Sequence, residues 1–302
     1  MYKRSVIPVI PDGYSVETER HNAALIGDYL ANLKQKSWAE KTLANYEVAL
    51  RQLFNFCAVA DRPFEEMTAS DAYNFISLEL AGYAPNSQRL KISTLRSFYE
   101  YLQGVGVSEV QPFLRTFMPR RERKRFTYIT DDQFLKFLKY LAGKSSFPVE
   151  FGAKLMRYAG LRVSEASNID LFADLKRSPY GYTVFVRGKG QKERSVPVFN
   201  KAFCREIAEL QSLYESPALP IKIEFTAQTL NSHLQNFSKE NGIYPTLSSH
   251  DLRRAFAQDL MTQTRDIEIV RSALGHNSYN TTLIYLKDSS ALLDKAAATV
   301  EM

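Results

Sequence analysis

Five short motifs in the second half of the chain bring together side chains that can do chemistry. They are Gly160-Leu161-Arg162-Val163-Ser164-Glu165, Gly188-Lys189-Gly190-Gln191-Lys192-Glu193-Arg194, His250-Asp251-Leu252-Arg253, Leu274-Gly275-His276 and, nine residues further on, Tyr285. Arginine and lysine bind anions, histidine transfers protons near neutral pH, and a tyrosine hydroxyl is a nucleophile only when it is helped to lose its proton. The residue types alone leave the reaction open.

Taken one at a time, these residues have ordinary structural explanations, which are favoured for any single one of them. The alternatives are a surface ion pair between Arg162 and Glu165, a solvated turn at Lys189, a helix cap at His250, a core histidine at His276 and a core aromatic at Tyr285. The chain has 17 tyrosines, most of which must be structural.

Several common catalytic patterns are absent from the sequence. It contains no P-loop, no GxGxxG and no HExxH motif, and its acidic residues form no cluster typical of a two-metal nuclease. The two cysteines, Cys57 and Cys204, match neither a metal-ligand spacing nor a disulfide framework. We therefore expect no cofactor, no metal and a reducing cytoplasmic environment.

The five motifs, in this order and spacing, resemble the tyrosine recombinase (phage integrase) family, which includes the Xer recombinases, Cre and lambda-type integrases. The match is strongest over residues 158–287, and in the N-terminal half the best local match is 41–46, Lys-Thr-Leu-Ala-Asn-Tyr. The resemblance implies a mainly α fold with a small β-sheet (α+β). It also implies an N-terminal SAM-like helical core-binding domain and a C-terminal catalytic domain, the simple two-domain type.

The reaction that the resemblance implies cleaves and rejoins DNA through a 3′-phosphotyrosine intermediate. Arg162 and Arg253 match the two arginines that stabilise charge on the scissile phosphate, and Tyr285 matches the nucleophile. Tyr279 is a nearby rival nucleophile that the family spacing disfavours. Because the phosphotyrosine link retains the bond energy, the 5′ hydroxyl of a partner strand can reverse the step without ATP.

The remaining roles also follow from the resemblance. His250 matches the general base or proton shuttle, His276 a hydrogen-bond donor to the phosphate, and Lys189 the general acid for the departing 5′ oxygen. Glu165 matches the acidic residue that supports the first arginine. The residue after Arg253 is an arginine where many relatives carry histidine, and we expect little effect on the chemistry.

The elements that must position these motifs can be read from apolar periodicity and turn residues. Four helices are expected in the first hundred residues; Leu43, Tyr46, Leu50, Leu53 and Cys57 form the apolar face of one of them. A hairpin is expected over 182–198, with helices around 200–214, 226–240, 250–263, 266–274 and 279–287. The predicted organisation is an N-terminal extension (1–19), a helical DNA-binding domain (20–110), a basic linker (111–126) and a catalytic domain (127–302).

Basic residues outside the motifs are candidates for DNA contacts. The net charge is +6 and the pI is near 9.1, a mild excess that permits a polyanionic partner without proving one. Five of the six residues 120–125 are basic, so the linker residues Arg120, Arg121 and Arg123 could lie along phosphates or form a solvated charge run. Arg89 and Arg96 share one face of the fourth helix, where exposed arginines are common.

The resemblance implies as partners double-stranded DNA with short inverted-repeat core sites and a homotetramer on two such sites. The tail around 291–300 would dock on a neighbouring protomer or pack on its own domain, and an accessory or partner recombinase is a further possibility. No run approaches the ~18 apolar residues of a membrane span, so no membrane partner is expected. We expect a cytoplasmic, nucleoid-associated protein.

Three functions remain open at the level of sequence. The leading one is a site-specific recombinase that integrates, excises or resolves a mobile element, with Xer-type resolution of chromosome or plasmid dimers as its alternative. The others are a DNA-binding protein of the same fold without catalysis and a type IB topoisomerase, which shares the chemistry. The complete set of catalytic residues argues against the DNA-binding protein, and the short length and Xer-like motifs argue against the topoisomerase.

Overall fold

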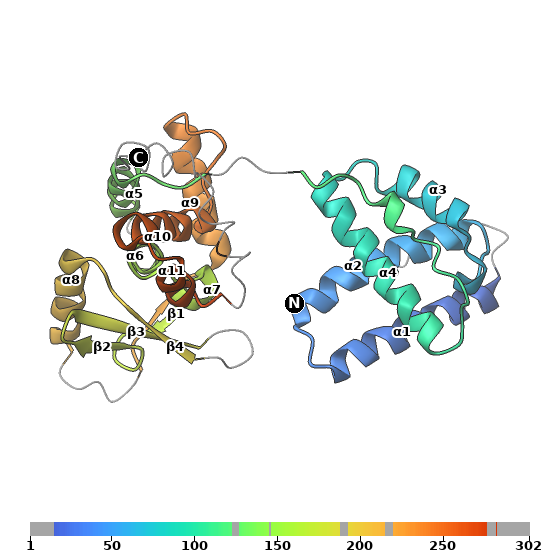
Figure 1. Ribbon diagram of the computed structural model, residues 1–302, viewed down its shortest axis with the longest axis horizontal. Coiled ribbons are helices and arrows are strands. Elements are labelled where there is room, and N and C mark those ends of the chain that lie inside the picture. The colour runs from blue at the N-terminus through green and yellow to red at the C-terminus, as the bar shows by residue number, and fades with distance from the viewer. Residues whose placement is uncertain are drawn as a thin grey trace, which may run out of the picture. The chain divides into compact units, whose positions relative to one another are not determined.

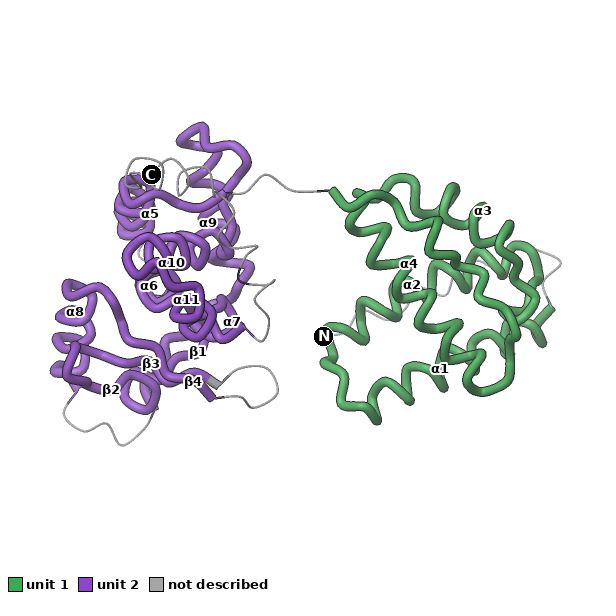
Figure 2. The backbone as a smooth tube through the Cα atoms, viewed as in Figure 1, with its two compact units in different colours: residues 1–124 green, residues 125–302 purple. Residues whose placement is uncertain are grey.

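The computed structural model divides the chain into two compact units, residues 1–124 and 125–302, shown in two colours in Figure 2. Each unit has its own hydrophobic core, and the two cores share no residue. The structure describes residues 15–122, 127–144, 146–187, 193–214, 220–276 and 282. Within the described residues, no helix is long and apolar enough to cross a membrane.

The first unit is a group of helices, as the sequence predicts (Figure 1). They are α1 (Val16–Gln35), α2 (Glu40–Val59), α3 (Ala69–Glu79) and α4 (Pro85–Gly104), with a 3-10 turn at Phe64–Glu66. Ser15 caps α1, so this helix begins inside the expected N-terminal extension. Thr68 and Asp71 cap α3 reciprocally, so this helix begins at Ala69.

Residues 111–122, expected as the first part of the linker, belong to the first unit and include a 3-10 turn at Arg115–Phe117. Side chains of α4 donate hydrogen bonds to their backbone: Arg96 to the carbonyl of Phe113, and Arg89 to that of Pro119 at 2.6 Å. Buried and half-buried carbonyls need such donors. Residues 123–126, with Arg123, lie outside the described part of the chain.

The second unit is built mainly of helices around a core of aromatic and aliphatic residues. Its helices are α5 (Asp131–Ala142), α6 (Phe147–Ala159), α7 (Val163–Ala166), α8 (Lys201–Ser212), α9 (Ala227–Glu240), α10 (Ser249–Thr264) and α11 (Ile267–Leu274). Those expected around 200–214, 226–240, 250–263 and 266–274 are confirmed within a few residues. The one expected at 279–287 lies almost wholly outside the described residues.

Two small antiparallel sheets complete the second unit (Figure 1). One has β2 (Leu175–Ser178), β3 (Gly181–Arg187) and β4 (Glu193–Pro197) in chain order, and it contains the expected hairpin, with Val184 opposite Val196. The other pairs β1 (Asn168–Asp170) with β5 (Lys222–Glu224). The strands β1, β2 and β5 are not predicted from the sequence, because they are three or four residues long and mostly polar.

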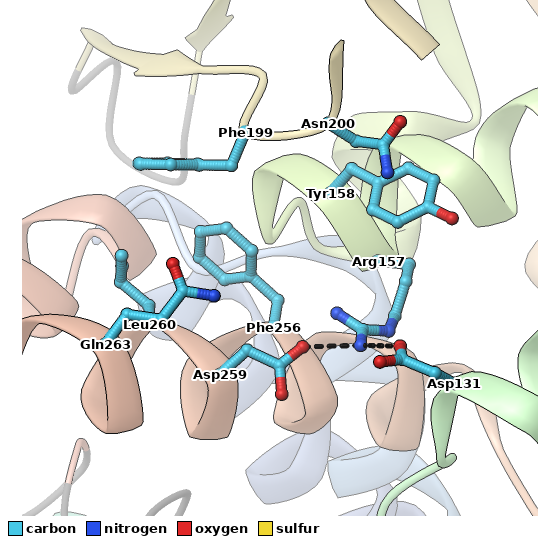
Figure 3. Close-up of a pocket in the computed structure, with 9 residues that line it drawn as sticks. All are labelled: Asp131, Arg157, Tyr158, Phe199, Asn200, Phe256, Asp259, Leu260 and Gln263. Atoms are coloured by element: carbon cyan, nitrogen blue, oxygen red, sulfur yellow. Dashed lines mark hydrogen bonds and ion pairs between the residues drawn. The ribbon is translucent and has the colours of Figure 1, made fainter. Parts of the chain in front are cut away.

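A buried arginine fastens together the helices that carry the motifs. Arg157 near the end of α6 forms ion pairs with Asp131 of α5 and Asp259 of α10. Figure 3 shows its guanidinium between the two carboxylates, beside Phe256 and a pocket of about 190 Å³. The Arg157 side chain is only 6% exposed, so this pairing fixes α10 against α6 and thereby the residues that follow or flank each helix.

Candidate active site

The first arginine motif forms a tight turn between α6 and α7. Gly160 ends α6 in the left-handed conformation (φ 63°), and a Cβ there would meet the Phe256 ring. Arg162 then begins α7, and its backbone nitrogen and Nη1 both donate to the carboxylate of Glu165, at 2.6 and 2.8 Å. The side chain of Glu165 is 5% exposed and that of Arg162 is 39% exposed. The ion pair between Arg162 and Glu165 considered from the sequence is therefore present, and it leaves the Arg162 guanidinium accessible.

The second arginine, Arg253, comes from the first half of α10 and is completely buried. Its Nη1 donates to the carbonyl of Gly160 and lies 3.7 Å from Glu165, while its Nη2 donates to the carbonyl of Leu274. The two sequence-predicted arginines thus share one carboxylate, although they lie 91 positions apart in the chain.

The end of α11 binds three arginines through three successive backbone carbonyls. Ala273 accepts from Nε of Arg194 at 3.3 Å, Leu274 from Arg253, and Gly275 from Nη2 of Arg162 at 3.4 Å. The last carbonyls of a helix have no partner inside the helix and carry its partial negative charge, so cations are favoured there. Three guanidinium groups are thereby collected around one carboxylate, an excess of two positive charges.

Glu165 is held as an anion by its neighbours. Burial alone would raise the pKa of its carboxyl, but hydrogen bonds from Arg194 and Arg162, together with their charges, lower that pKa to about 2. Arg194 binds it through two parallel bonds of 2.8 and 2.9 Å. Arg194 is the last residue of the second sequence motif, and the sequence predicts no role for it. The available signal was its place five residues after Lys189 in that motif.

His276 follows the left-handed Gly275 and is buried against Arg253. Nη2 of Arg253 lies 3.3 Å from Nε2 of the ring, and because arginine only donates, Nε2 accepts. Nδ1 therefore carries the proton and donates to the hydroxyl of Thr282 at 3.1 Å. Burial and the charges of Arg253 and Arg162 lower the pKa of His276 to about 4, so the ring is neutral in this state.

His250 lies in the first turn of α10, three residues before Arg253, and is exposed. The pKa of its ring is lowered, mainly because neighbouring groups exclude water and also because of the positive charges of Arg254 and Arg253. The adjacent Asp251 is buried and caps α10, accepting from Ser248 and, at 2.7 Å, from the hydroxyl of Thr127. An exposed imidazole with a lowered pKa is unprotonated near neutral pH, so His250 can accept a proton from a group that approaches the start of α10.

Arg254, which stands where many relatives carry histidine, binds the residues around the start of α10. Its Nη1 lies 3.1 Å from the Asp251 carboxylate and 3.4 Å from the carbonyl of Thr127, and it is one of the charges that lower the pKa of His250. The structure thus brings together five of the predicted site residues: Arg162, Glu165, His250, Arg253 and His276. Lys189, Tyr285 and Tyr279 lie outside the described residues.

A second basic feature lies wholly in the first unit. Four arginines line one open pocket of about 730 Å³, from α4 and the segment after it: Arg89, Arg96, Arg115 and Arg120. Glu100 also lines it, 3.9 Å from Arg96. Of the predicted DNA-contacting residues, Arg120 and Arg121 are exposed, whereas Arg89 and Arg96 are half-buried and donate to backbone carbonyls. Arg115 was not predicted.

A metal-binding cluster is not found in the part of the chain that the structure describes: no three His, Cys, Asp or Glu residues there could hold an ion. The groups that face one another in the second unit are instead arginines, one glutamate and two histidines. Such a set can bind an anionic group and stabilise negative charge on it.

Solved structures with the same fold include recombinases bound to DNA. The XerH site-specific recombinase, bound to a palindromic difH substrate, matches with a TM-score of 0.69 at 20% identity, covering 85% of this chain and 79% of that one. A lambda integrase dimer bound to a COC′ core site matches with a TM-score of 0.70 at 17% identity, covering 92% and 82%. At these identities the likeness establishes the fold.

Sequence comparisons identify the family. The phage integrase family matches residues 127–291, and the phage integrase N-terminal SAM-like domain matches residues 26–104. A tyrosine recombinase XerC of Thermodesulfovibrio yellowstonii is 29% identical over 279 residues, 86% of this chain and 90% of that protein. A tyrosine recombinase of Thermosipho africanus is 27% identical over 269 residues, 87% and 93%. The chain therefore belongs to the phage integrase family of tyrosine recombinases, enzymes that cleave and rejoin DNA strands at specific sites.

Proposed function

We propose that the chain recombines DNA at specific sites by forming a 3′-phosphotyrosine bond with Tyr285, at the cluster of arginines described above. One observation carries the proposal: Arg162 and Arg253 share the Glu165 carboxylate and adjoining carbonyls at the end of α11. A scissile phosphodiester that entered this cluster would meet two fixed guanidinium groups, which stabilise the extra negative charge of the transition state.

Each cleavage step exchanges one phosphorus–oxygen bond for another. The Tyr285 oxygen attacks phosphorus and gives its proton to His250, whose lowered pKa keeps the ring able to accept it. The bond from phosphorus to the 5′ oxygen breaks, and Lys189 protonates the departing oxygen. His276 lies beside Arg253 and would hydrogen-bond the phosphate when its Nε2 carries a proton. The 5′ hydroxyl of a partner strand reverses these steps, so rejoining needs no energy source.

We propose double-stranded DNA with short inverted-repeat core sites as the partner, and four copies of the chain on two sites. The likeness to DNA-bound recombinases supports this, as does a lambda integrase tetramer bound to a Holliday junction, which matches with a TM-score of 0.69. In the first unit, Arg115 and Arg120 are the exposed cations of the basic pocket and would contact phosphates. Such contacts position the duplex without reading its sequence.

The biological setting follows the same reasoning. We propose integration, excision or resolution of a mobile element, with dimer resolution of the Xer type as the alternative that the XerC relatives favour. A recombinase acts where its DNA lies, so we place the protein in the cytoplasm with the nucleoid. An accessory protein or second recombinase is compatible with this proposal.

Covalent trapping tests the proposal. Wild type, Tyr285→Phe and Tyr279→Phe are incubated with fragmented source DNA, including the region around the gene, then denatured, captured and the attached DNA sequenced. We expect adducts at one inverted-repeat site with wild type and Tyr279→Phe, and none with Tyr285→Phe, which still binds DNA. Adducts that persist in Tyr285→Phe would overturn the nucleophile, scattered adducts would indicate a topoisomerase, and no wild-type adduct would contradict the proposal.

A further inference from the structure

Arg194 connects the carboxylate at the centre of the arginine cluster with the end of α11. It lies at the start of β4, with 14% of its side chain exposed, and binds both oxygens of Glu165 at 2.8 and 2.9 Å. Its Nε donates to the carbonyl of Ala273 at the end of α11. An arginine fork on a carboxylate fixes both position and rotation, which a single contact cannot do.

The rotation of Glu165 decides where Arg162 lies. Oε1 accepts from Nη1 of both Arg194 and Arg162, and Oε2 accepts from Nη2 of Arg194 and from the backbone nitrogen of Arg162. A carboxylate free to rotate would lose the pair that holds the Arg162 side chain. Arg162 is 39% exposed, so this pair and a 3.4 Å bond to Gly275 are its described restraints.

Gly275 makes room for Arg194. A Cβ at this position would lie 2.8 Å from Cδ and 3.1 Å from Nε of Arg194. The glycine also has φ 61°, a conformation that residues with side chains rarely adopt. The turn that carries His276 therefore leaves a space that the Arg194 side chain fills.

We propose that Arg194 is a positioning residue for strand cleavage, which acts by locking Glu165 and, through it, Arg162 in the orientation that receives the phosphate. This rests on the proposed function of the site. Arg194 itself does not contact the substrate. Removing it should slow the cleavage step and leave DNA affinity nearly unchanged, since affinity depends on many phosphate contacts.

The measurement is the first-order rate of covalent adduct formation on a nicked core-site duplex, together with the Kd for the same DNA. We expect Arg194→Gln to slow the adduct by about 10- to 100-fold, the usual effect of losing an outer partner of a functional group. Arg194→Lys keeps the charge without the fork and should recover part of the rate. Arg205→Gln, an exposed arginine on α8, is the matched control and should react like wild type.

Two further readouts separate positioning from general damage. In a Glu165→Gln background, Arg194→Gln should cause little additional loss, because both changes break one chain of contacts. The Arg194→Gln rate should also fall at a higher pH than that of wild type when the pH is lowered. Without Arg194, burial and Arg162 alone set the pKa of the Glu165 carboxyl, which therefore lies higher than in wild type. A merely less stable protein would show neither effect.

The outcomes are distinct. Wild-type adduct with an Arg194→Gln rate within twofold of it would overturn this inference and leave the proposed function intact. If the double variant lost adduct rate by the product of the two single losses, Arg194 would not act through Glu165, and that part of the inference would be overturned. Absence of adduct in wild type would instead overturn the proposed function. If Arg194→Gln does not fold, the Arg194→Lys rate and its double variant with Glu165→Gln carry the same test.

Discussion

Nδ1 of His276 lies 3.1 Å from the hydroxyl oxygen of Thr282, three positions before the proposed nucleophile Tyr285. Both residues are buried. The bond fixes the ring so that Nε2 faces Arg253. It therefore connects the histidine of the fourth motif to the segment that carries the tyrosine, and sets which ring nitrogen is turned toward the arginine cluster.

Replacing Thr282 with valine should disturb His276 without changing the shape of the side chain. The buried Nδ1 proton would lose its acceptor, which costs about 1–3 kcal/mol in the free energy of unfolding. The adduct rate should fall as well, because the ring is free to rotate. Urea unfolding and the trapping assay measure the two effects. Thr282→Ser keeps the hydroxyl and should stay close to wild type; equal losses in both variants would contradict the assignment.

Acid should weaken the fold through His276. The folded pKa is about 4 and the ordinary value is 6.5, so the unfolded chain binds the proton more readily. The buried neutral ring contributes fully to the free energy of unfolding above pH 6.5. This contribution is lost as the pH falls from 6.5 toward 4.

Urea unfolding at pH 7.5 and pH 5.0 measures this pH dependence. The free energy of unfolding of wild type should be lower at pH 5.0 than at pH 7.5, and the difference should be smaller for His276→Asn. His250, whose pKa is also lowered, leaves part of the dependence in place. An unchanged pH dependence in His276→Asn would show that the ring is not buried as a neutral group.

Replacing Arg157 with methionine should destabilise the second unit. The change leaves Asp131 and Asp259 without their shared cation, but their side chains are 81% and 44% exposed and stay hydrated. The loss is therefore that of hydrogen bonds between charged groups, about 1.5–3 kcal/mol, measured by denaturant unfolding. Lys136→Gln removes an exposed pair with Asp132 on α5 and should cost about 0–1 kcal/mol. Comparable losses of stability in the two variants would contradict the proposed role of Arg157 in holding α5, α6 and α10 together.

The basic pocket of the first unit should contribute to DNA affinity at every sequence. Arg120→Gln removes one exposed cation, so the Kd should rise for specific and unrelated duplexes alike, and the salt slope should fall by about 1. Fluorescence anisotropy over a range of salt concentrations measures both. Arg51→Gln on α2, whose charge pairs with Glu47, is the control. A loss confined to the specific duplex would indicate base reading at Arg120.

Much of this site was predictable because it consists of local motifs that sit at element ends. The turn after Gly160, the start of α10 and the glycine that ends α11 are each marked by residues whose backbone or capping preferences are strong. The apolar periodicity of the longer helices likewise placed most of them within a few residues.

What escaped prediction depends on contacts between distant segments. Arg194 lies 29 residues from Glu165 and 79 from Ala273, and no local pattern indicates that its charge turns inward. Arg89 and Arg96 illustrate the opposite case. They resemble exposed helix arginines in sequence, yet tertiary structure supplies backbone carbonyls that engage both.

The acceptors at the end of α11 belong to the main chain. Substitution replaces a side chain and leaves the carbonyls of residues 273–275 in place, so the cluster of guanidinium groups tolerates a change of residue identity where a ring of carboxylates would not. The exception is the position with no side chain at all. At Gly275 a Cβ would lie 2.8 Å from Cδ of Arg194, so any residue with a side chain there would displace the arginine that binds Glu165.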